Sequence, residues 1–134
     1  MTTEYVLDGT SIGTLEEFYD EFGDKVSAQI RLGRNLDALN DILRGGFGTP
    51  LEGFTIRWSA SAISRENLGY GETVRQLERR LERCHPSNRD KINRELEDAR
   101  RGVGLTVFDW LVETIRDHGP GGEEADDNVH LILA

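Results

Sequence analysis

The chain has little of what marks a secreted, membrane-bound or nucleic-acid-binding protein. Its 134 residues include one cysteine, Cys84, so neither an internal disulfide nor a thiolate metal site can form. No hydrophobic run approaches the length of a membrane helix, and the N-terminal stretch has neither a basic segment nor an apolar signal core. Basic residues number 16 against 25 acidic ones, which argues against binding the phosphates of a nucleic acid. We therefore expect a cytoplasmic protein that binds neither membranes nor nucleic acids.

The negative charge is concentrated toward the two ends of the chain. Residues 1–56 carry ten acids and four bases, residues 57–104 eight acids and eleven bases, and residues 105–134 seven acids and one base. The net charges of the three segments are therefore −6, +3 and −6. At this length, and with 37% hydrophobic residues, the chain is expected to form a single domain. Its acidic surface favours a basic partner, besides keeping the protein soluble.

Three short segments are predicted to be β-strands. Residues 4–7 form a β-rich run that ends at a turn, and residues 54–58 alternate between β-branched or aromatic and polar side chains. Residues 129–133 are a continuous apolar run, which is typical of a strand in the middle of a parallel sheet. Helices between the strands would return each strand in the same direction. The sequence predicts an α/β fold, a small three-stranded parallel sheet packed with helices.

Capping residues predict the starts of two further helices. Thr14 with Glu17 and Thr106 with Asp109 each match a capping box, in which the first side chain and the fourth satisfy each other's backbone N–H groups. An apolar stripe at helical spacing follows each box. We expect the second of these helices to end at Gly119, because glycine commonly follows a helix C-terminus.

The middle of the chain predicts two helices that pack as an antiparallel hairpin. Residues 72–84 and 90–103 each repeat apolar side chains at spacings of three and four, which makes a narrow helical stripe. The intervening stretch HPSN breaks the first helix, and Ser87 with Asp90 is a candidate cap for the second. Residues 102–104 contain two glycines and end the hairpin.

The stretch GRNLDALNDIL, residues 33–43, places two aspartates one helical turn apart. Asn35 is the predicted N-cap, and the helix dipole favours Asp37 in the first turn but gives no reason for Asp41. Both acids lie opposite the apolar sector, and like charges four residues apart destabilise a helix by about 0.2–0.5 kcal/mol. The simplest interpretation is a solvated face on which Arg44 dilutes the repulsion. The alternative is a face that binds a partner.

No arrangement typical of an enzyme is visible in the sequence. A glycosidase-like carboxylate pair needs one acid with a raised pKa in a pocket, whereas these two aspartates are predicted on an exposed face. The three histidines, His85, His118 and His130, are scattered and match no metal-binding spacing, so we expect a structural role for each and no metal or other cofactor. The stretch GGFGTP follows a helix and precedes a strand, the reverse of a phosphate-binding loop. We expect that the protein is not an enzyme.

The acidic stretch resembles the helix by which the barstar family of intracellular inhibitors is recognised. That family has the pattern G-x-N-L-D-A-L-x-D-x-L, and eight positions of this chain fit it: Gly33, Asn35, Leu36, Asp37, Ala38, Leu39, Asp41 and Leu43. The YVLDG run before a capped helix, the strand ending in Trp58 and the apolar C-terminal strand support the resemblance. It covers roughly residues 4–66 and 105–134 of a single inhibitor domain, 1–134, and leaves about 68–104 as an inserted helical hairpin.

The resemblance implies a partner and a set of contact residues. In the family an acidic helix and its adjoining loop block the active site of a barnase-like, guanine-preferring ribonuclease in a 1:1 complex. By the motif, Asp41 takes the place of a substrate phosphate and Asp37 is its companion. The surrounding contacts are implied to be Arg31, Gly33, Asn40, Arg44, Gly45 and Gly46. A further family acid falls at Thr114, so its neighbour Glu113 is added to the set.

The chain departs from the family where aromatic residues contact the partner. Arg31, Asn40 and Gly46 stand at those positions, and aromatic side chains often dominate binding energy. The resemblance therefore does not extend to barnase as the particular target. A second hypothesis is a regulatory adaptor, in which the fold persists and a partner that is not a nuclease docks on the helical hairpin. Under both hypotheses we expect the free protein to be a monomer.

Overall fold

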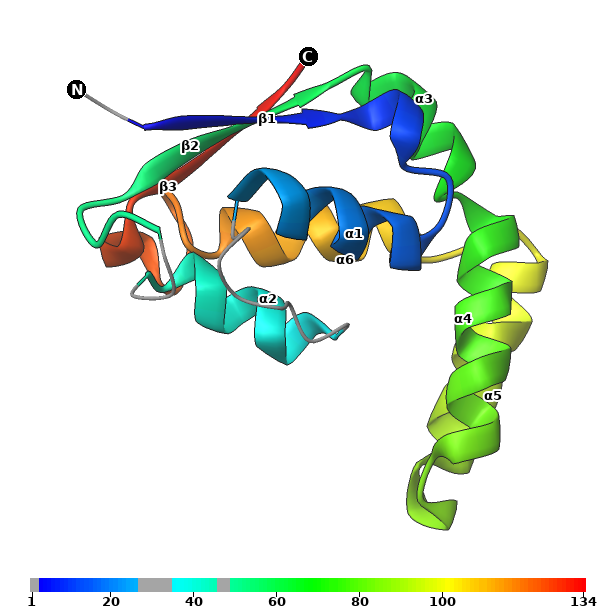
Figure 1. The fold of residues 1–134 in the computed structure, drawn as a ribbon. Coiled ribbons are helices and arrows are strands. Elements are labelled where there is room, and N and C mark those ends of the chain that lie inside the picture. The colour runs from blue at the N-terminus through cyan, green and yellow to red at the C-terminus, as the bar shows by residue number, and fades with distance from the viewer. Residues whose placement is uncertain (1–2, 27–34, 46–48) are drawn as a thin grey trace.

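A three-stranded parallel sheet lies at the top of the molecule in Figure 1, a computed structural model that describes residues 3–26, 35–45 and 49–134. The strands are β1 (Glu4–Asp8), β2 (Phe54–Ser59) and β3 (Val129–Leu133), hydrogen-bonded in the order β1-β2-β3. Glu4 pairs with Thr55, and Thr55 pairs with His130. The predicted α/β fold with a three-stranded parallel sheet is confirmed.

The placement of β3 in the middle of the sheet was wrong. The central strand is β2, and β3 forms an edge. The side chains of Phe54, Ile56 and Trp58 are buried on one face of β2, where the helices pack. On the opposite face, Val6 is 46% exposed and Ile132 is 37% exposed. The described helices cover only one face of the sheet. The apolar residues on both faces of β3 were therefore misleading, because only one of those faces is buried.

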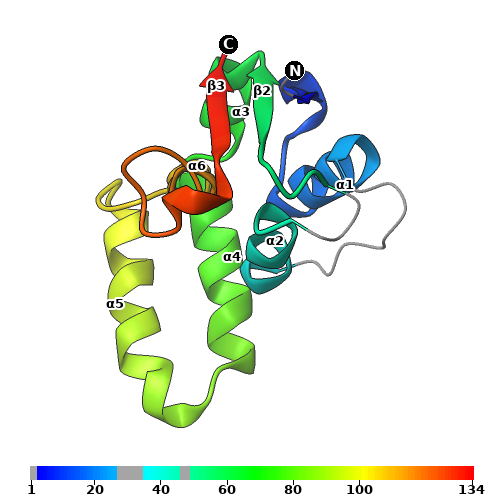
Figure 2. The ribbon, with the colours of Figure 1, turned by 90° about the vertical axis from the view of Figure 1, so that its left-hand side faces the viewer.

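The helices form two layers under the sheet. Helices α1 (Leu15–Val26) and α6 (Val107–Arg116) lie against it, and α2 (Leu36–Leu43) lies on their far side (Figures 1 and 2). The main core joins all three layers through fully buried side chains: Leu7, Phe18, Phe22, Leu39, Ile56, Trp58 and Leu111. Burial of this core fixes α2 to the body along one side and leaves its other side in solvent.

The predicted helix caps are largely confirmed. The Asn35 side chain accepts a 2.8 Å hydrogen bond from the Ala38 amide, and Thr106 and Asp109 form both halves of a capping box. Thr14 accepts from the Glu17 amide at 3.1 Å, as predicted. Its box is incomplete, because the Glu17 carboxylate accepts instead from the Gly13 amide.

A short helix that the sequence did not indicate, α3 (Ser61–Asn67), follows β2. The stretch is rich in serine, which competes with helical hydrogen bonds through its side chain. Ser64 is fully buried, accepts from the Trp58 indole Nε1 at 2.9 Å, and donates to the Gly9 carbonyl at 2.9 Å. Tertiary hydrogen bonds therefore hold this helix despite its weak intrinsic propensity.

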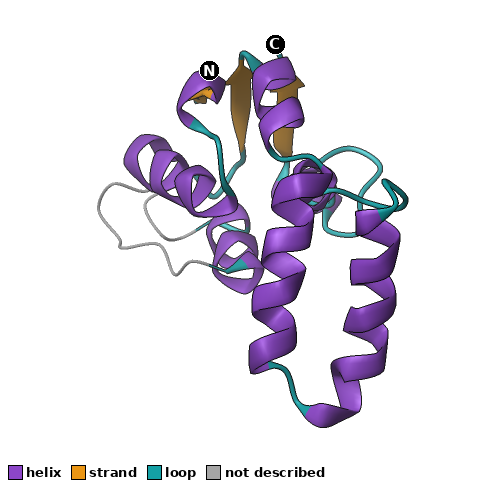
Figure 3. Cartoon of the chain, turned by 90° about the vertical axis from the view of Figure 1, so that its right-hand side faces the viewer, coloured by secondary structure: helices purple, strands orange, loops and turns teal. Residues whose placement is uncertain are grey.

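Helices α4 (Tyr70–Arg83) and α5 (Arg89–Arg100) form the predicted antiparallel hairpin, which extends past α2 and away from the sheet (Figures 1 and 3). A small separate core of Leu77, Leu96 and Ala99 joins the two helices. The predicted cap at Ser87 is wrong, because the N-cap of α5 is Asn88, without a capping side-chain hydrogen bond, and Ser87 lies within the 3₁₀ turn Pro86–Asn88. Among the described residues, no helix is both long and apolar enough to cross a bilayer.

Candidate partner-binding site

Helix α2 presents its two aspartates to solvent, as predicted. Leu39, Ile42 and Leu43 are buried in the main core, whereas Asp37 and Asp41 are both exposed. The main core holds the helix along its buried side, so the two carboxylates project from a rigid support. The face is therefore suited to contact a cationic surface on another molecule.

Arg44 links Asp41 to an acidic loop near the C-terminus, residues 119–128. Its Nη1 lies 3.0 Å from Asp41 Oδ1, and its Nε lies 2.9 Å from Glu124 Oε1. The hydrogen bond from Arg44 to Glu124 raises the pKa of Arg44 and lowers the pKa of Glu124. All three side chains remain substantially exposed to solvent, which screens these ion pairs. Arg44 thus reduces the repulsion on α2, as the simpler interpretation expected, while leaving Asp41 accessible.

His118, just after α6, ties α2 to the same acidic loop. The ring is fully buried, with Nε2 2.8 Å from Asn40 Oδ1 and Nδ1 2.7 Å from Asp127 Oδ2. Glu124 Oε2 lies 3.4 Å from Nε2. His118 therefore has the structural role expected of it. Asn40 is half-buried, and its side-chain oxygen is used in this contact, so only the remainder of its amide is available to a partner.

The cluster of His118, Glu124 and Asp127 brings three groups of metal-ligating type within 4.8 Å of one another. Both ring nitrogens of His118 already have oxygen partners, and Glu124 is held by the guanidinium of Arg44. This geometry is that of a hydrogen-bonded ion-pair network rather than of an open coordination site. Its function is to hold the acidic loop against the C-terminal half of α2.

The segment after α2 brings an unpredicted apolar residue beside the C-terminus of that helix. Gly45 has a φ of 90°, a backbone conformation that favours glycine, and a Cβ there would lie 3.2 Å from Leu51 Cδ2. Leu51 is 75% exposed, the most exposed of the large apolar side chains described. An apolar residue inside a glycine- and proline-rich loop was the sequence signal for it. Arg31, Gly33 and Gly46, also predicted contacts, lie outside the described residues.

Glu113 is exposed on α6 and lines a shallow cavity of ≈ 280 Å³ that joins α2 to the hairpin. Leu36 at the start of α2, Arg80 of α4 and Trp110 of α6 also line it. Thr114, where the family acid falls, is half-buried and donates to the Trp110 carbonyl at 2.7 Å. Glu113 is therefore the better placed of the two to meet a partner.

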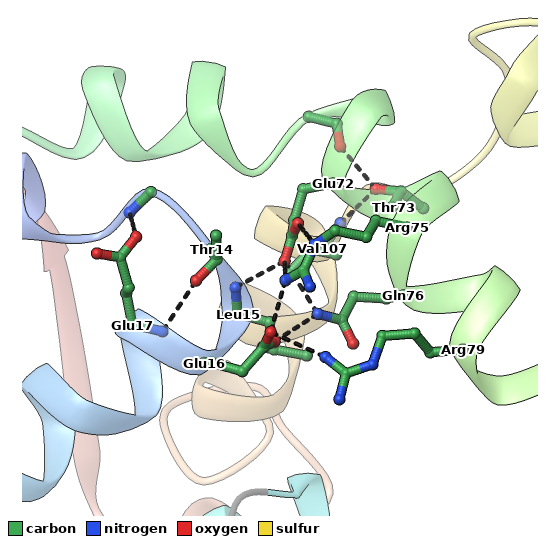
Figure 4. Close-up of polar contacts among 12 residues, drawn as sticks. Thr14, Leu15, Glu16, Glu17, Glu72, Thr73, Arg75, Gln76, Arg79 and Val107 are labelled. Atoms are coloured by element: carbon green, nitrogen blue, oxygen red, sulfur yellow. Dashed lines mark hydrogen bonds and ion pairs between the residues drawn. The ribbon is translucent and has the colours of Figure 1, made fainter. Parts of the chain in front are cut away.

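A polar junction, shown in Figure 4, fixes the hairpin to α1. The buried carboxylate of Glu72 accepts a 2.8 Å hydrogen bond from the Leu15 amide and 2.6 Å and 2.8 Å hydrogen bonds from Arg75. Arg75 also donates to Glu16 at 2.6 Å, as does Gln76. Glu72 thus occupies the N-terminus of α1, where backbone N–H groups lack helical partners and a negative charge is favoured.

Two carboxyl groups of this junction have altered pKa values. Burial is the largest single influence on Glu16 and on Glu72 and raises the pKa of each. Hydrogen bonds from Arg75, Gln76 and backbone N–H groups, together with the positive charge of Arg75, outweigh burial, so the net pKa of both groups is lowered. The backbone donor to Glu72 is the Leu15 amide.

The hairpin also caps α6. The Thr73 hydroxyl, almost fully buried, accepts a 2.9 Å hydrogen bond from the Val107 amide and donates to the Gly69 carbonyl at 2.8 Å (Figure 4). Adjacent residues of α4 therefore satisfy the N-termini of two helices of the body. The orientation of the hairpin relative to α2 is set by these buried contacts.

Comparison with known families identifies the chain. The family model described as Barstar (barnase inhibitor) matches residues 2–109. The match includes the whole of α2 and the hairpin and ends within the first turn of α6. No curated protein matches the chain. Because the family match spans most of the sequence and agrees with the three-stranded parallel sheet and the aspartate helix, the chain belongs to the barstar family.

Proposed function

We propose that the protein inhibits a barnase-like, guanine-preferring ribonuclease by covering its active site with the exposed face of α2 and the adjoining loop. The complex is 1:1, and the inhibitor acts in the cytoplasm of the cell that makes the nuclease. Asp41 takes the place of a substrate phosphate, and Asp37 supplies a second carboxylate. The observation that carries this proposal is the pair of exposed aspartates on a helix whose other face is locked into the core.

The charge and rigidity of α2 support this role. A ribonuclease active site that binds RNA phosphate must present cationic groups, and charge-assisted hydrogen bonds from arginine to carboxylate are stronger than neutral ones. Asp37 and Asp41 meet such groups without reorganising the backbone, because the core and the Asn40–His118 contact hold α2 in place. The net charge of −9 steers a basic partner toward the complex.

Leu51 and Glu113 extend the proposed contact surface. Leu51 is exposed beside the C-terminus of α2 and offers the apolar contact that the aromatic positions of the family no longer supply here. Glu113 lies by Leu36 at the opposite end of α2. Gly45, beside Leu51, leaves room for a partner to approach the backbone. The aspartate pair therefore has an apolar contact, Leu51, at one end of α2 and an acidic contact, Glu113, at the other.

The test is RNA cleavage by a barnase-like, guanine-preferring ribonuclease titrated with the wild-type protein and with four variants: Asp37→Ala, Asp41→Ala, the double variant Asp37→Ala/Asp41→Ala, and Glu66→Ala. We expect stoichiometric inhibition by wild type and by the Glu66→Ala control, whose exposed carboxylate lies on α3. Removing one partner of a desolvated charge pair costs about 2–5 kcal/mol of binding, a range to which the barnase–barstar complex itself contributes. Equal inhibition by the wild type and the double aspartate variant would reject the proposal.

Salt provides a second, independent readout. Because opposite charges steer the encounter, the association rate should fall as ionic strength rises, while the dissociation rate changes little. An association rate that does not respond to salt would contradict the electrostatic role of α2.

Deletion of the hairpin is the simplest test of the adaptor hypothesis, but it is not an informative one. Deleting the hairpin would remove Glu72 and Thr73, which cap α1 and α6, and would therefore damage the body itself. Surface substitutions on the hairpin are the informative variants. An adaptor predicts that they abolish partner binding while substitution of both aspartates has no effect.

A further inference from the structure

A groove of ≈ 590 Å³ runs between α1 and the hairpin, outside the proposed aspartate contact. Its apolar lining includes Leu15 and Tyr19 of α1 and Ile92 of α5. Its charged lining is mostly basic and comes from one side of α4: Arg79, Arg80 and Arg83. The groove therefore combines an apolar floor with a row of guanidinium groups.

Two of these three arginines make no ion pair with a carboxylate of the described residues. Arg79 lies 2.9 Å from Glu16, which also accepts from Arg75. Arg80 and Arg83 have no carboxylate within salt-bridge distance in the part of the chain that the structure describes, and both are exposed. Positions three and four residues apart are neighbours on a helix, so the row brings like charges together. Such a row is electrostatically unfavourable until an anionic group meets it.

Arg80 connects this groove with the cavity at the N-terminal end of α2. Its guanidinium carbon lies 4.5 Å from the centre of the Trp110 ring, and the side chain also lines the cavity that contains Leu36 and Glu113. Arginine and tryptophan are the residue types most enriched among those that dominate binding energy. Because Glu72 and Thr73 anchor α4 to the body, the groove keeps a fixed position relative to α2.

We propose that this groove is a second contact for the same partner and that it binds an acidic segment carrying an apolar side chain. The identity of the partner as a ribonuclease rests on the proposed function. The groove itself rests on charge complementarity and on its apolar lining. A ribonuclease with only basic groups around its active site is repelled by Arg80 and Arg83, whereas one with an acidic segment there is favoured. The groove thus selects among nucleases that present similar active sites to α2.

RNA is a weaker candidate for the same groove. A nucleic acid strand has a phosphate at every nucleotide, so a strand extending past the arginine row would bring further phosphates against Glu95, Glu113 and Asp117 in the adjoining cavity. A short acidic segment can end within the row. Nucleic acid binding depends on neutralising several phosphates in succession, which a short basic row within an acidic protein does not provide. The apolar floor offers Leu15 and Ile92, which match an aliphatic or aromatic side chain of a peptide.

The groove can be tested without the nuclease. An isotopically labelled full-length chain is titrated with a synthetic peptide of about a dozen residues that alternates glutamate with leucine and phenylalanine. Matched titrations use its lysine counterpart and a short single-stranded RNA. We expect amide shifts at Leu15, Tyr19 and Gln76 with the acidic peptide alone. No such shifts, or equal shifts with the RNA, would overturn the proposal.

Charge reversal locates the effect and separates it from folding. The double variant Arg80→Glu/Arg83→Glu should bind the acidic peptide at least about tenfold more weakly than wild type does. Its binding to any ribonuclease that wild type inhibits should weaken by the same factor. The control Arg89→Glu/Arg94→Glu makes the same change of charge on exposed positions of α5 that do not line the groove, and should stay within about twofold of wild type. The single variant Arg83→Glu avoids the Arg80–Trp110 contact if the double variant is less stable. Equal weakening by the control would overturn the proposal, whereas failure of ribonuclease inhibition by wild type would leave the peptide result standing.

Discussion

Helices α2 and α4 carry charged rows of opposite sign, yet they are attached to the body by different means. On α2, Asp37 and Asp41 project from a helix whose far side is buried in the main apolar core. On α4, the arginine row projects from a helix whose anchor is polar: Glu72 and Thr73 bind the N-termini of α1 and α6. Each row places like charges one helical turn apart, at a cost of about 0.2–0.5 kcal/mol per pair.

The difference shows two ways of holding a charged surface rigid. An apolar anchor gains from the area it buries and tolerates small shifts in position. A polar anchor contributes less energy but fixes direction, since each buried donor needs its acceptor at hydrogen-bond distance. We therefore expect α2 to respond mainly to changes in packing, and α4 to changes in hydrogen bonding and in pH.

The largest expected effect compares two equally buried leucines. Leu39→Ala on α2 should lower the free energy of unfolding by about 2–5 kcal/mol, because it opens a cavity in the main core. Leu77→Ala on α4 should cost an amount near the lower end of that range, since its cluster has few members and the hairpin helices can close on the gap. Urea denaturation of both variants tests this, and a larger loss for Leu77→Ala would break the comparison.

A smaller effect should follow from the polar anchor. Glu72→Gln removes the charge that Arg75 and the N-terminus of α1 share, and should lower the free energy of unfolding by about 1–3 kcal/mol. The matched control is Glu78→Gln, an exposed glutamate of the same helix, which should leave stability nearly unchanged. Urea midpoints that coincide for the two variants would show that the junction is not the anchor.

Acid should weaken the same junction. The pKa values of Glu16 and Glu72 are lowered in the folded protein from about 4.5, so their contribution to stability is complete above that pH and is lost as pH falls through the folded values. Urea midpoints measured across this range should fall more steeply for wild type than for a Glu16→Gln/Glu72→Gln variant. Parallel curves would indicate that other carboxylates dominate acid unfolding.

The smallest expected effect concerns the link between α2 and the acidic loop. Glu124→Gln should leave the urea midpoint unchanged, because the Arg44–Glu124 pair is exposed and solvent screens it. Its consequence should appear in binding instead, since Arg44 then pairs more closely with Asp41 and competes with a cationic partner. Weaker ribonuclease inhibition at unchanged stability is the expected combination. A clear loss of stability would show that this ion pair also supports the fold.

Local sequence patterns predicted those features of the fold that depend on residues close together in the sequence. The N-caps at Asn35 and Thr106 and the exposure of both aspartates followed from helical spacing. The edge position of β3 and the helix α3 did not, because both depend on what packs against them. The partners of the site residues are more distant still, 78 positions for His118 with Asn40 and 80 for Arg44 with Glu124. Residue pattern alone carries no signal for such pairs.

The contacts from α4 to the backbone of α1 and α6 also distinguish undocking of the hairpin from unfolding of the helices in the body. The amides of Leu15 and Val107 lie at helix N-termini, where no helical carbonyl can accept from them, and only Glu72 and Thr73 occupy them. Their hydrogen exchange with solvent therefore requires the hairpin to leave the body, while amides inside α1 exchange only when α1 itself unfolds. Two backbone protons thus report separately on the docking of the hairpin.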